Sequence, residues 1–92
     1  MTKYKIKLSK TFKKSFKKLN NSERELFYQI TQKLLNGENL AQKYKDHALS
    51  GNLKDFRECH LKPDLLLIYQ IKDNELILYC FDIGSHSELF GK

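Results

Sequence analysis

Three histidines are the side chains of this sequence best suited to carry protons, and all three lie in its second half. They are His47, His60 and His86. An imidazole titrates near neutral pH, so it can act as a general acid or base. No spacing among them matches a zinc motif, and Cys59 and Cys80 form no CxxC pair. The sequence therefore predicts proton carriers, with no metal and no other cofactor.

The surroundings of these histidines favour chemistry over the structural role that is usual for a lone histidine. His47 follows an acidic residue in an irregular stretch, and His60 comes near the end of a predicted strand. His86 lies in a Gly-Ser-His-Ser loop. Loops and strand ends are where reactive groups gather. A hydrogen-bonded structural histidine is the alternative at each position.

The charge of the chain is divided unevenly. Residues 1–45 carry twelve Lys or Arg against three Asp or Glu, and residues 46–92 carry five against eight. The net charge of +6 therefore joins a half of +9 to a half of −3. Five lysines of the first half share one predicted helix face, the lysine stripe: Lys10, Lys13, Lys14, Lys17 and Lys18. It is interpreted as a surface for nucleic acid or an acidic partner, with a solvated face as the alternative.

The hydrophobic pattern predicts an α+β fold, with two helices on a mostly antiparallel four-stranded sheet in the order β-α-α-β-β-β. Alternation over residues 2–8 predicts a strand with lysines on its open side. Ser9 offers an N-cap for the first helix. A capping box of Ser22 and Glu25 predicts the start of a second helix, which ends at Gly37. A length of 92 residues predicts one domain over residues 1–92.

The second half of the chain predicts three strands, over residues 56–61, 65–72 and 75–83. The middle strand is nearly continuous apolar, as is typical of a strand covered on both faces. Residues 73–74 predict a two-residue hairpin turn, and residues 84–90 a tail without an element of its own. The two cysteines are expected to be unpaired apolar filler. The core candidates are Phe12, Phe16, Leu26, Ile30, Leu34, Leu66, Ile68 and Leu78.

Three segments of the second half form a specific pattern when taken together. They are residues 46–52, 56–69 and 84–90, which read DHALSGN, FRECHLKPDLLLIY and GSHSELF. In this order they resemble the YafQ branch of the RelE/ParE superfamily, the toxins of bacterial type II toxin–antitoxin pairs. The resemblance implies a RelE-like fold, cleavage of mRNA on the ribosome and silencing by a cognate antitoxin. It also implies catalytic positions and a base-contacting aromatic: His47, His60, Asp64 and His86, with Phe90 as the aromatic.

RNA cleavage without a metal has simple chemical needs. The substrate's own 2′-OH attacks the adjacent phosphate, so the enzyme must supply a base, an acid for the leaving 5′-oxygen and cations. We assign His86 as the acid and His60, oriented by Asp64, as the base, with His47 supporting or replacing it. Glu58 shares the period-2 face of His60 and is a further candidate base.

One cation expected from the resemblance is missing. The family places an arginine two residues before the glycine of the last segment, where this chain has Asp82, or Cys80 when counted from the other side. An acid at Asp82 would repel phosphate. Arg57 or Lys62 is expected to substitute, although Arg57 lies in the opposite strand phase and a structural ion pair is its alternative. Otherwise the protein is a weakened or binding-only member, either a ParE-like poison of a target protein or an antitoxin-binding partner.

Several classes of protein are excluded by simpler features. The longest apolar run, residues 65–69, is too short to span a bilayer, and residues 1–10 lack the pattern of a secretory signal. Two cysteines are too few for a disulfide framework. We therefore expect a cytoplasmic bacterial protein with no membrane partner and no small-molecule cofactor, whose partners are mRNA, the ribosome and an antitoxin.

Overall fold

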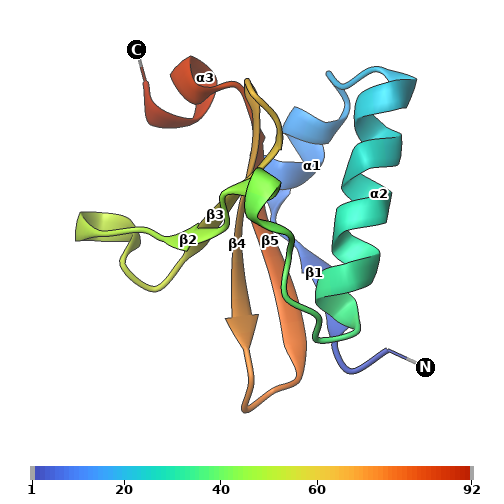
Figure 1. The fold of residues 1–92 in the computed structure, drawn as a ribbon. Helices are drawn as coiled ribbons and strands as arrows, with labels where there is room; N and C mark the ends of the chain where they lie inside the picture. Colours follow the sequence, from blue (N-terminus) through green and yellow to red (C-terminus); the bar gives the residue numbers. More distant parts are fainter. Residues whose placement is uncertain (1, 92) are drawn as a thin grey trace.

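A five-stranded mixed sheet, with helices packed against it, organises the chain (Figure 1). The computed structural model describes residues 2–91. The strands stand in the order β1-β5-β4-β3-β2; β1 runs parallel to β5, and the other neighbours are antiparallel. The α+β class is confirmed, and the predicted four strands gain a fifth, β2. The strands are β1 Lys5–Leu8, β2 His47–Ala48, β3 Arg57–Lys62, β4 Leu65–Lys72 and β5 Ile77–Gly84.

Two helices, α1 (Lys10–Phe16) and α2 (Asn21–Leu35), cover one face of the sheet. As predicted, Ser9 caps α1, since its Oγ accepts the Phe12 N–H at 2.9 Å. The predicted capping box of α2 was two residues too late. Asn20 and Glu23 form it, because each side chain accepts the other's backbone N–H. No helix of residues 2–91 has the length and apolar character needed to cross a membrane.

The long segment between α2 and β3 begins at the predicted left-handed glycine, Gly37, with φ of +79°. It contains two short 3-10 helices, η1 (Gln42–Tyr44) and η2 (Gly51–Leu53), on either side of β2. The predicted two-residue hairpin between β4 and β5 is wrong. Residues 73–76 connect Lys72 to its partner Ile77, with Leu76 in the left-handed region.

The tail after β5 was predicted to have no element of its own. It forms a third helix, α3 (His86–Phe90). Ser85 and Glu88 make its capping box. Gly84 permits this approach, because a Cβ there would meet Glu88 Oε1 at 2.8 Å. The glycine therefore lets a helix begin immediately at the end of β5.

The core lies between the helices and the sheet. Of the eight predicted core residues, Phe16 and Leu26 are half-buried and the others are buried. Every residue from Leu65 to Tyr69 is at most 3% exposed, so β4 is covered on both faces as predicted. Cys59 and Cys80 are buried free thiols on strands separated by β4. Burial raises the pKa of both thiols, to about 12 for Cys80, which makes them unreactive filler.

The alternation predicted for the first strand holds only in part. Tyr4 is buried, but Ile6 is 43% exposed although its pattern placed it on the buried side. The reason is the position of β1 at the edge of the sheet, where it pairs with β5 alone.

Two irregularities in the sheet change where side chains point. Ile68 pairs with Asp82 but Tyr69 pairs with Cys80, so Phe81 is an extra residue in β5. A second register shift lies between His60 and Lys62 of β3. Such bulges break the alternation of side chains between the two faces of a sheet. Both lie beside the candidate site.

Candidate active site

The face of the sheet that α1 and α2 do not cover, the open face, carries the first group of candidate residues. Cys59 and Leu61 of β3 belong to the core on the helix side. Because side chains alternate along a strand, Glu58 and His60 point to the open face. His47 of β2 pairs directly with Glu58, so its side chain joins them there.

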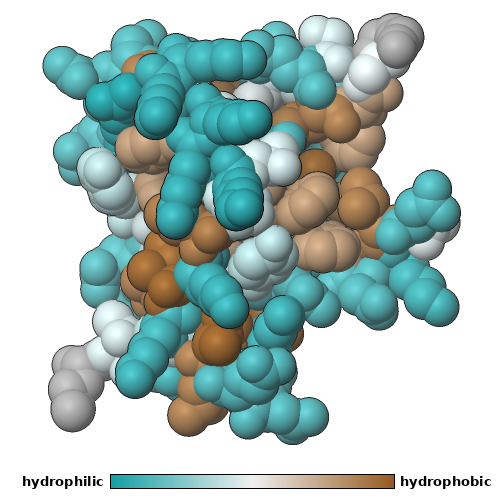
Figure 2. Space-filling model, turned by 180° about the vertical axis from the view of Figure 1, so that it is seen from behind, coloured by the Kyte–Doolittle hydropathy of each residue, from teal (hydrophilic) through white to brown (hydrophobic). Residues whose placement is uncertain are grey.

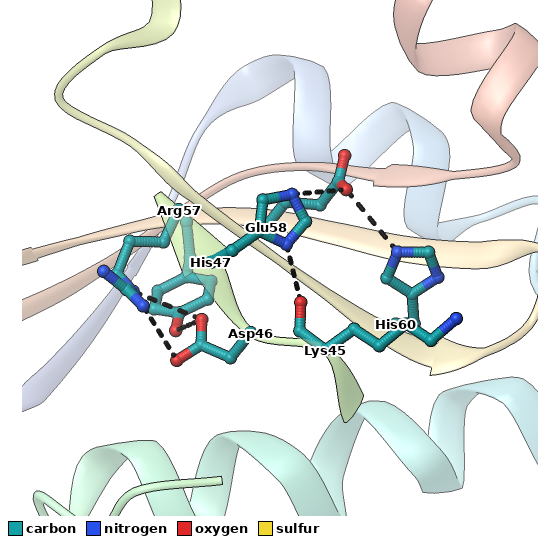
Figure 3. A network of polar contacts seen from close by, with 7 residues as sticks. Lys45, Asp46, His47, Arg57, Glu58 and His60 are labelled. Atoms are coloured by element: carbon teal, nitrogen blue, oxygen red, sulfur yellow. Dashed lines mark hydrogen bonds and ion pairs between the residues drawn. The ribbon is translucent and has the colours of Figure 1, made fainter. Parts of the chain in front are cut away.

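The carboxylate of Glu58 lies between two imidazoles (Figure 3). Its Oε1 is 3.3 Å from His47 Nε2 and 3.6 Å from His60 Nε2. The Glu58 side chain is 7% exposed, whereas that of His47 is 50% exposed. We call these three residues the His–Glu–His cluster. One buried carboxylate thus contacts two potential proton carriers at the protein surface.

The position of one proton in this cluster follows from its hydrogen bonds. His47 Nδ1 lies 2.6 Å from the backbone oxygen of Lys45. Since a carbonyl oxygen only accepts, Nδ1 must carry a proton, and Nε2 is the nitrogen that can gain or lose one. That nitrogen faces Glu58. The arrangement suits proton transfer at the open face.

His86 and Phe90 form the second group of candidate residues, on α3. Their ring centroids are 5.0 Å apart, and Phe90 is 38% exposed. Asp64 accepts the backbone N–H of His86 at 3.2 Å, and no hydrogen bond among residues 2–91 joins it to His60. The predicted role of Asp64 in orienting His60 is therefore not seen. Asp64 lies in the turn after β3, beside the start of α3, and Glu58 is the carboxylate next to His60.

The two groups border one area of the open face. His60 pairs with Leu66 of β4, and Leu66 pairs with Gly84 of β5. Two strand spacings put Gly84 about 10 Å from His60. His86 follows two residues after Gly84. A substrate lying over β4 can therefore meet both groups.

Both predicted substitute cations are held in ion pairs with carboxylates. Arg57 Nε donates to Asp46 at 3.2 Å, and Tyr69 Oη donates to the same carboxylate. The hydrogen bond to Asp46 raises the pKa of Arg57. This is the structural ion pair given as its alternative, on the other side of the strand from Glu58. Lys62 Nζ lies 3.0 Å from Glu23 Oε2 of α2, beyond the second register shift.

The two positions considered for the family arginine also face elsewhere. Asp82 Oδ1 accepts from Ser15 Oγ of α1 at 2.6 Å and from the Ile83 N–H at 2.8 Å. Asp82 is thus turned toward α1, and the predicted repulsion of phosphate at the site is wrong. Cys80 is buried in the core. Phe81 is the residue of this segment that packs on the open face.

Sequence reasoning missed two cations that line the same pocket as His60. Lys43 and Lys45 belong to the η1 segment, which directly precedes Asp46 and His47. This closeness in sequence to His47 was the available signal. They border a pocket of about 430 Å³ lined by Leu26, Lys43, Tyr44, Lys45, His60, Leu61, Lys62 and Pro63. No group of His, Cys, Asp or Glu within residues 2–91 could hold a metal ion.

The lysine stripe is exposed, and within residues 2–91 none of its members forms an ion pair. Helix α1 ends at Phe16, earlier than predicted, so Lys17 caps it and Lys18 follows in a turn. Seen from behind, hydrophilic side chains gather over α1 (Figure 2). The stripe is a group of exposed lysines on α1 and the turn after it, and it includes no residue of the His–Glu–His cluster.

Comparisons with known proteins agree over nearly the whole chain. Residues 4–91 match the family model described as the bacterial toxin of type II toxin–antitoxin systems, YafQ. The mRNA interferase toxin YafQ of Escherichia coli (strain B / BL21-DE3) is 35% identical over 89 residues, covering 94% of this chain and 95% of that protein.

Solved structures of two relatives have the same fold. A crystal structure of a metal-bound toxin from Helicobacter pylori is 50% identical, with a TM-score of 0.84, and the match covers 95% of this chain and 99% of that chain. The E. coli DinJ–YafQ toxin–antitoxin complex contains a chain that is 30% identical, with a TM-score of 0.84 and coverage of 97% and 99%.

Proposed function

Because this chain belongs to the YafQ family of bacterial type II toxin–antitoxin toxins, we propose that it is an endoribonuclease that cleaves mRNA on the ribosome, in the cytoplasm. The resemblance drawn from three sequence segments is confirmed by the family match over residues 4–91. The relatives named mRNA interferase support the activity. The His–Glu–His cluster is the observation that carries the mechanism.

The proposed reaction needs no metal. A base of the cluster, His60 or Glu58, takes the proton of the substrate's 2′-OH, and the 2′-oxygen attacks the adjacent phosphorus. His86 gives a proton to the 5′-oxygen as its bond to phosphorus breaks. The products are a 2′,3′-cyclic phosphate and a 5′-hydroxyl end. Glu58 orients both imidazoles, since its Oε1 is the atom that His47 and His60 share.

The charge that develops on the phosphate requires a cation. Lys43 and Lys45 border the pocket beside His60, and we assign them this role in place of the missing arginine. We assign contact with a base to Phe90, whose ring lies 5.0 Å from that of His86. The lysine stripe would hold the RNA backbone or ribosomal RNA, because phosphate contacts by lysine supply affinity without sequence preference.

A cognate antitoxin is the proposed protein partner. A YafQ relative from E. coli is known in complex with the antitoxin DinJ. The net charge of +9 over residues 1–45 favours a partner whose binding segment is acidic. Such a segment would cover the lysine stripe and keep RNA from it.

Cleavage by the purified protein on mRNA-programmed ribosomes tests the proposal. New RNA ends should carry 2′,3′-cyclic phosphate, and a 2′-deoxy nucleotide at the cut site should abolish them. His86→Ala should lower the cleavage rate about 100-fold or more with unchanged thermal unfolding. Ser87→Ala, at the next exposed position of α3, is the matched control. Cleavage by His86→Ala at the wild-type rate would overturn the proposal.

A binding-only toxin is the second candidate function. It is favoured by one observation, the lack of a cation at both Asp82 and Cys80. Such a protein would arrest growth by occupying a target protein, as the ParE branch does. Growth arrest on expression, without new RNA ends, would establish this candidate and exclude the nuclease.

A further inference from the structure

Three aromatic side chains gather on the open face beside the His–Glu–His cluster. The ring centroid of Phe56 lies 5.1 Å from that of Phe81 and 6.4 Å from that of Tyr79. Tyr79 and Phe81 are themselves 6.4 Å apart. All three are half-buried, so part of each ring stays accessible. We call them the aromatic platform.

The sheet explains why these rings share the open face. Leu78 and Cys80 are buried in the core on the helix side, so Tyr79 between them points away from it. Phe81 is the extra residue of the bulge, and its ring packs on Phe56. The next residue, Asp82, is turned to α1. The bulge thus leaves an aromatic ring, and no acid, next to the site.

The platform and the cluster are neighbours, because Phe56 directly precedes β3. Phe56 precedes Glu58 by two residues, which puts the two side chains on one face about 7 Å apart. Phe90 lies on the opposite side of the cluster area, next to His86. A chain lying over β4 would therefore meet an aromatic group at each end, with the proton carriers between them.

The chemistry of the platform suits a nucleotide. Lys72 Nζ lies 5.1 Å from the centroid of the Tyr79 ring, so a cation lies over one ring of the platform. Aromatic faces next to a basic group are what single-stranded nucleic acids use, since every base has a π-face and every link has a phosphate. The net charge of +6 acts in the same direction.

We propose that the aromatic platform stacks the mRNA base that flanks the cleaved phosphate on the side away from Phe90. This inference rests on the proposed nuclease function and adds a second base-binding position to it. Phe81 makes the central contact, because it is the bulge residue of β5 and its ring contacts both other rings. The platform contributes binding, while proton transfer stays with the cluster.

The experiment uses ribosomes programmed with an mRNA that has a 2′-deoxy nucleotide at the cut site. The fluorescent base 2-aminopurine is placed on either side of it. Wild-type protein should quench the fluorescence on one flank through Phe81 and on the other through Phe90. Phe81→Leu keeps an apolar side chain but removes the ring, so it should abolish quenching on its own flank only. Phe81→Tyr should keep it, and Tyr79→Leu is the second variant that should weaken it.

Kinetics on cleavable mRNA give an independent readout. Phe81→Leu should raise KM about tenfold and leave kcat within about twofold, as for a lost binding contact. His86→Ala should keep the quenching and lose the cleavage, which separates the platform from the proposed reaction. Unchanged quenching and KM in both Phe81→Leu and Tyr79→Leu would overturn the platform. Lost affinity for the antitoxin with unchanged RNA quenching would also overturn it and assign these rings to a protein partner.

Discussion

Neighbouring residues of β3 and of the segment that ends in β2 build two polar networks of opposite character (Figure 3). On one side of the strand, Asp46 accepts from Arg57 and from the buried Tyr69, so its carboxylate is closed in by donors. On the other side, Glu58 is shared by two imidazoles at 3.3 and 3.6 Å, and His47 is half exposed. The closed network holds the fold together. The open one has groups left to act on a substrate.

Glu58→Gln should break this contrast most strongly. Without the carboxylate the two imidazoles lose their shared anion and one candidate base disappears, so the cleavage rate should fall about 100-fold to 10,000-fold. The free energy of unfolding should change by less than about 1 kcal/mol, because glutamine fills the same space. Single-turnover cleavage and urea unfolding measure the two effects. A large loss of stability with full activity would make Glu58 a structural residue like Asp46.

Neutralising part of the lysine stripe should give the next largest effect. In Lys13→Gln/Lys14→Gln/Lys17→Gln, affinity for programmed ribosomes should fall about tenfold or more. The slope of log affinity against log salt should decrease by about 0.7–0.9 for each lost phosphate contact. The single-turnover rate at saturation should not change. Lys5→Gln/Lys7→Gln/Lys33→Gln removes the same charge elsewhere and is the control. An unchanged salt slope in the first variant would show that the stripe does not bind RNA and faces solvent or the antitoxin instead.

Tyr69→Phe tests the closed network. Loss of the hydroxyl removes one donor to Asp46 inside the fold, so the free energy of unfolding should fall by about 1–2 kcal/mol. Cleavage should stay within about twofold of wild type, because Tyr69 lies on the helix side of the sheet. Chemical denaturation and cleavage kinetics on the same preparation check both. A drop in cleavage larger than tenfold would show that the two networks are coupled.

Glu23→Gln should have the smallest effect, and that effect depends on pH. The Asn20 N–H, and then Lys62, lower the pKa of Glu23. A carboxyl whose pKa is lowered in the folded protein stabilises the fold while it is charged. This stabilisation is complete at pH values above the ordinary carboxyl pKa, and it is lost as the pH falls through the pKa of the folded state. Wild type should therefore exceed Glu23→Gln by about 0.5–1 kcal/mol at pH 7 and match it at an acidic pH where the carboxyl of the folded protein is protonated. Urea unfolding at both pH values measures this. Cleavage at pH 7 should stay unchanged, because Glu23 belongs to the capping box of α2.

The period of each strand made much of this arrangement predictable. Alternation in β3 put Glu58 with His60 and Arg57 on the other side, and the apolar run of β4 predicted burial on both faces. These are local patterns, set by backbone geometry. The capping box of α2 was predicted two residues too late, because Ser22 and Asn20 are both good N-cap residues. Only the folded structure shows that Asn20 is the N-cap.

Contacts between distant segments were beyond the reach of such patterns. The strand β2 places His47 opposite Glu58. With only two residues it is too short to show the alternating pattern that predicts a strand. Asp64 accepts the backbone N–H of His86, which is 22 residues away in the sequence. Glu58, and not Asp64, is the carboxylate next to His60. The two register shifts also escaped. The shift in β5 accompanies the turn of Asp82 toward α1, and the shift in β3 precedes Lys62, which pairs with Glu23.

The extra residue in β5 decides which side chain of this strand lies on the open face. Without Phe81, alternation from Ile83 back to Cys80 would turn position 82 onto the open face. A single-codon deletion could therefore exchange an aromatic surface for a charged one, with no substitution at either position. Under the proposed function, a toxin shortened by one residue in this strand would lose a base-stacking ring and gain a carboxylate next to the cluster, while the histidines and the core stay intact.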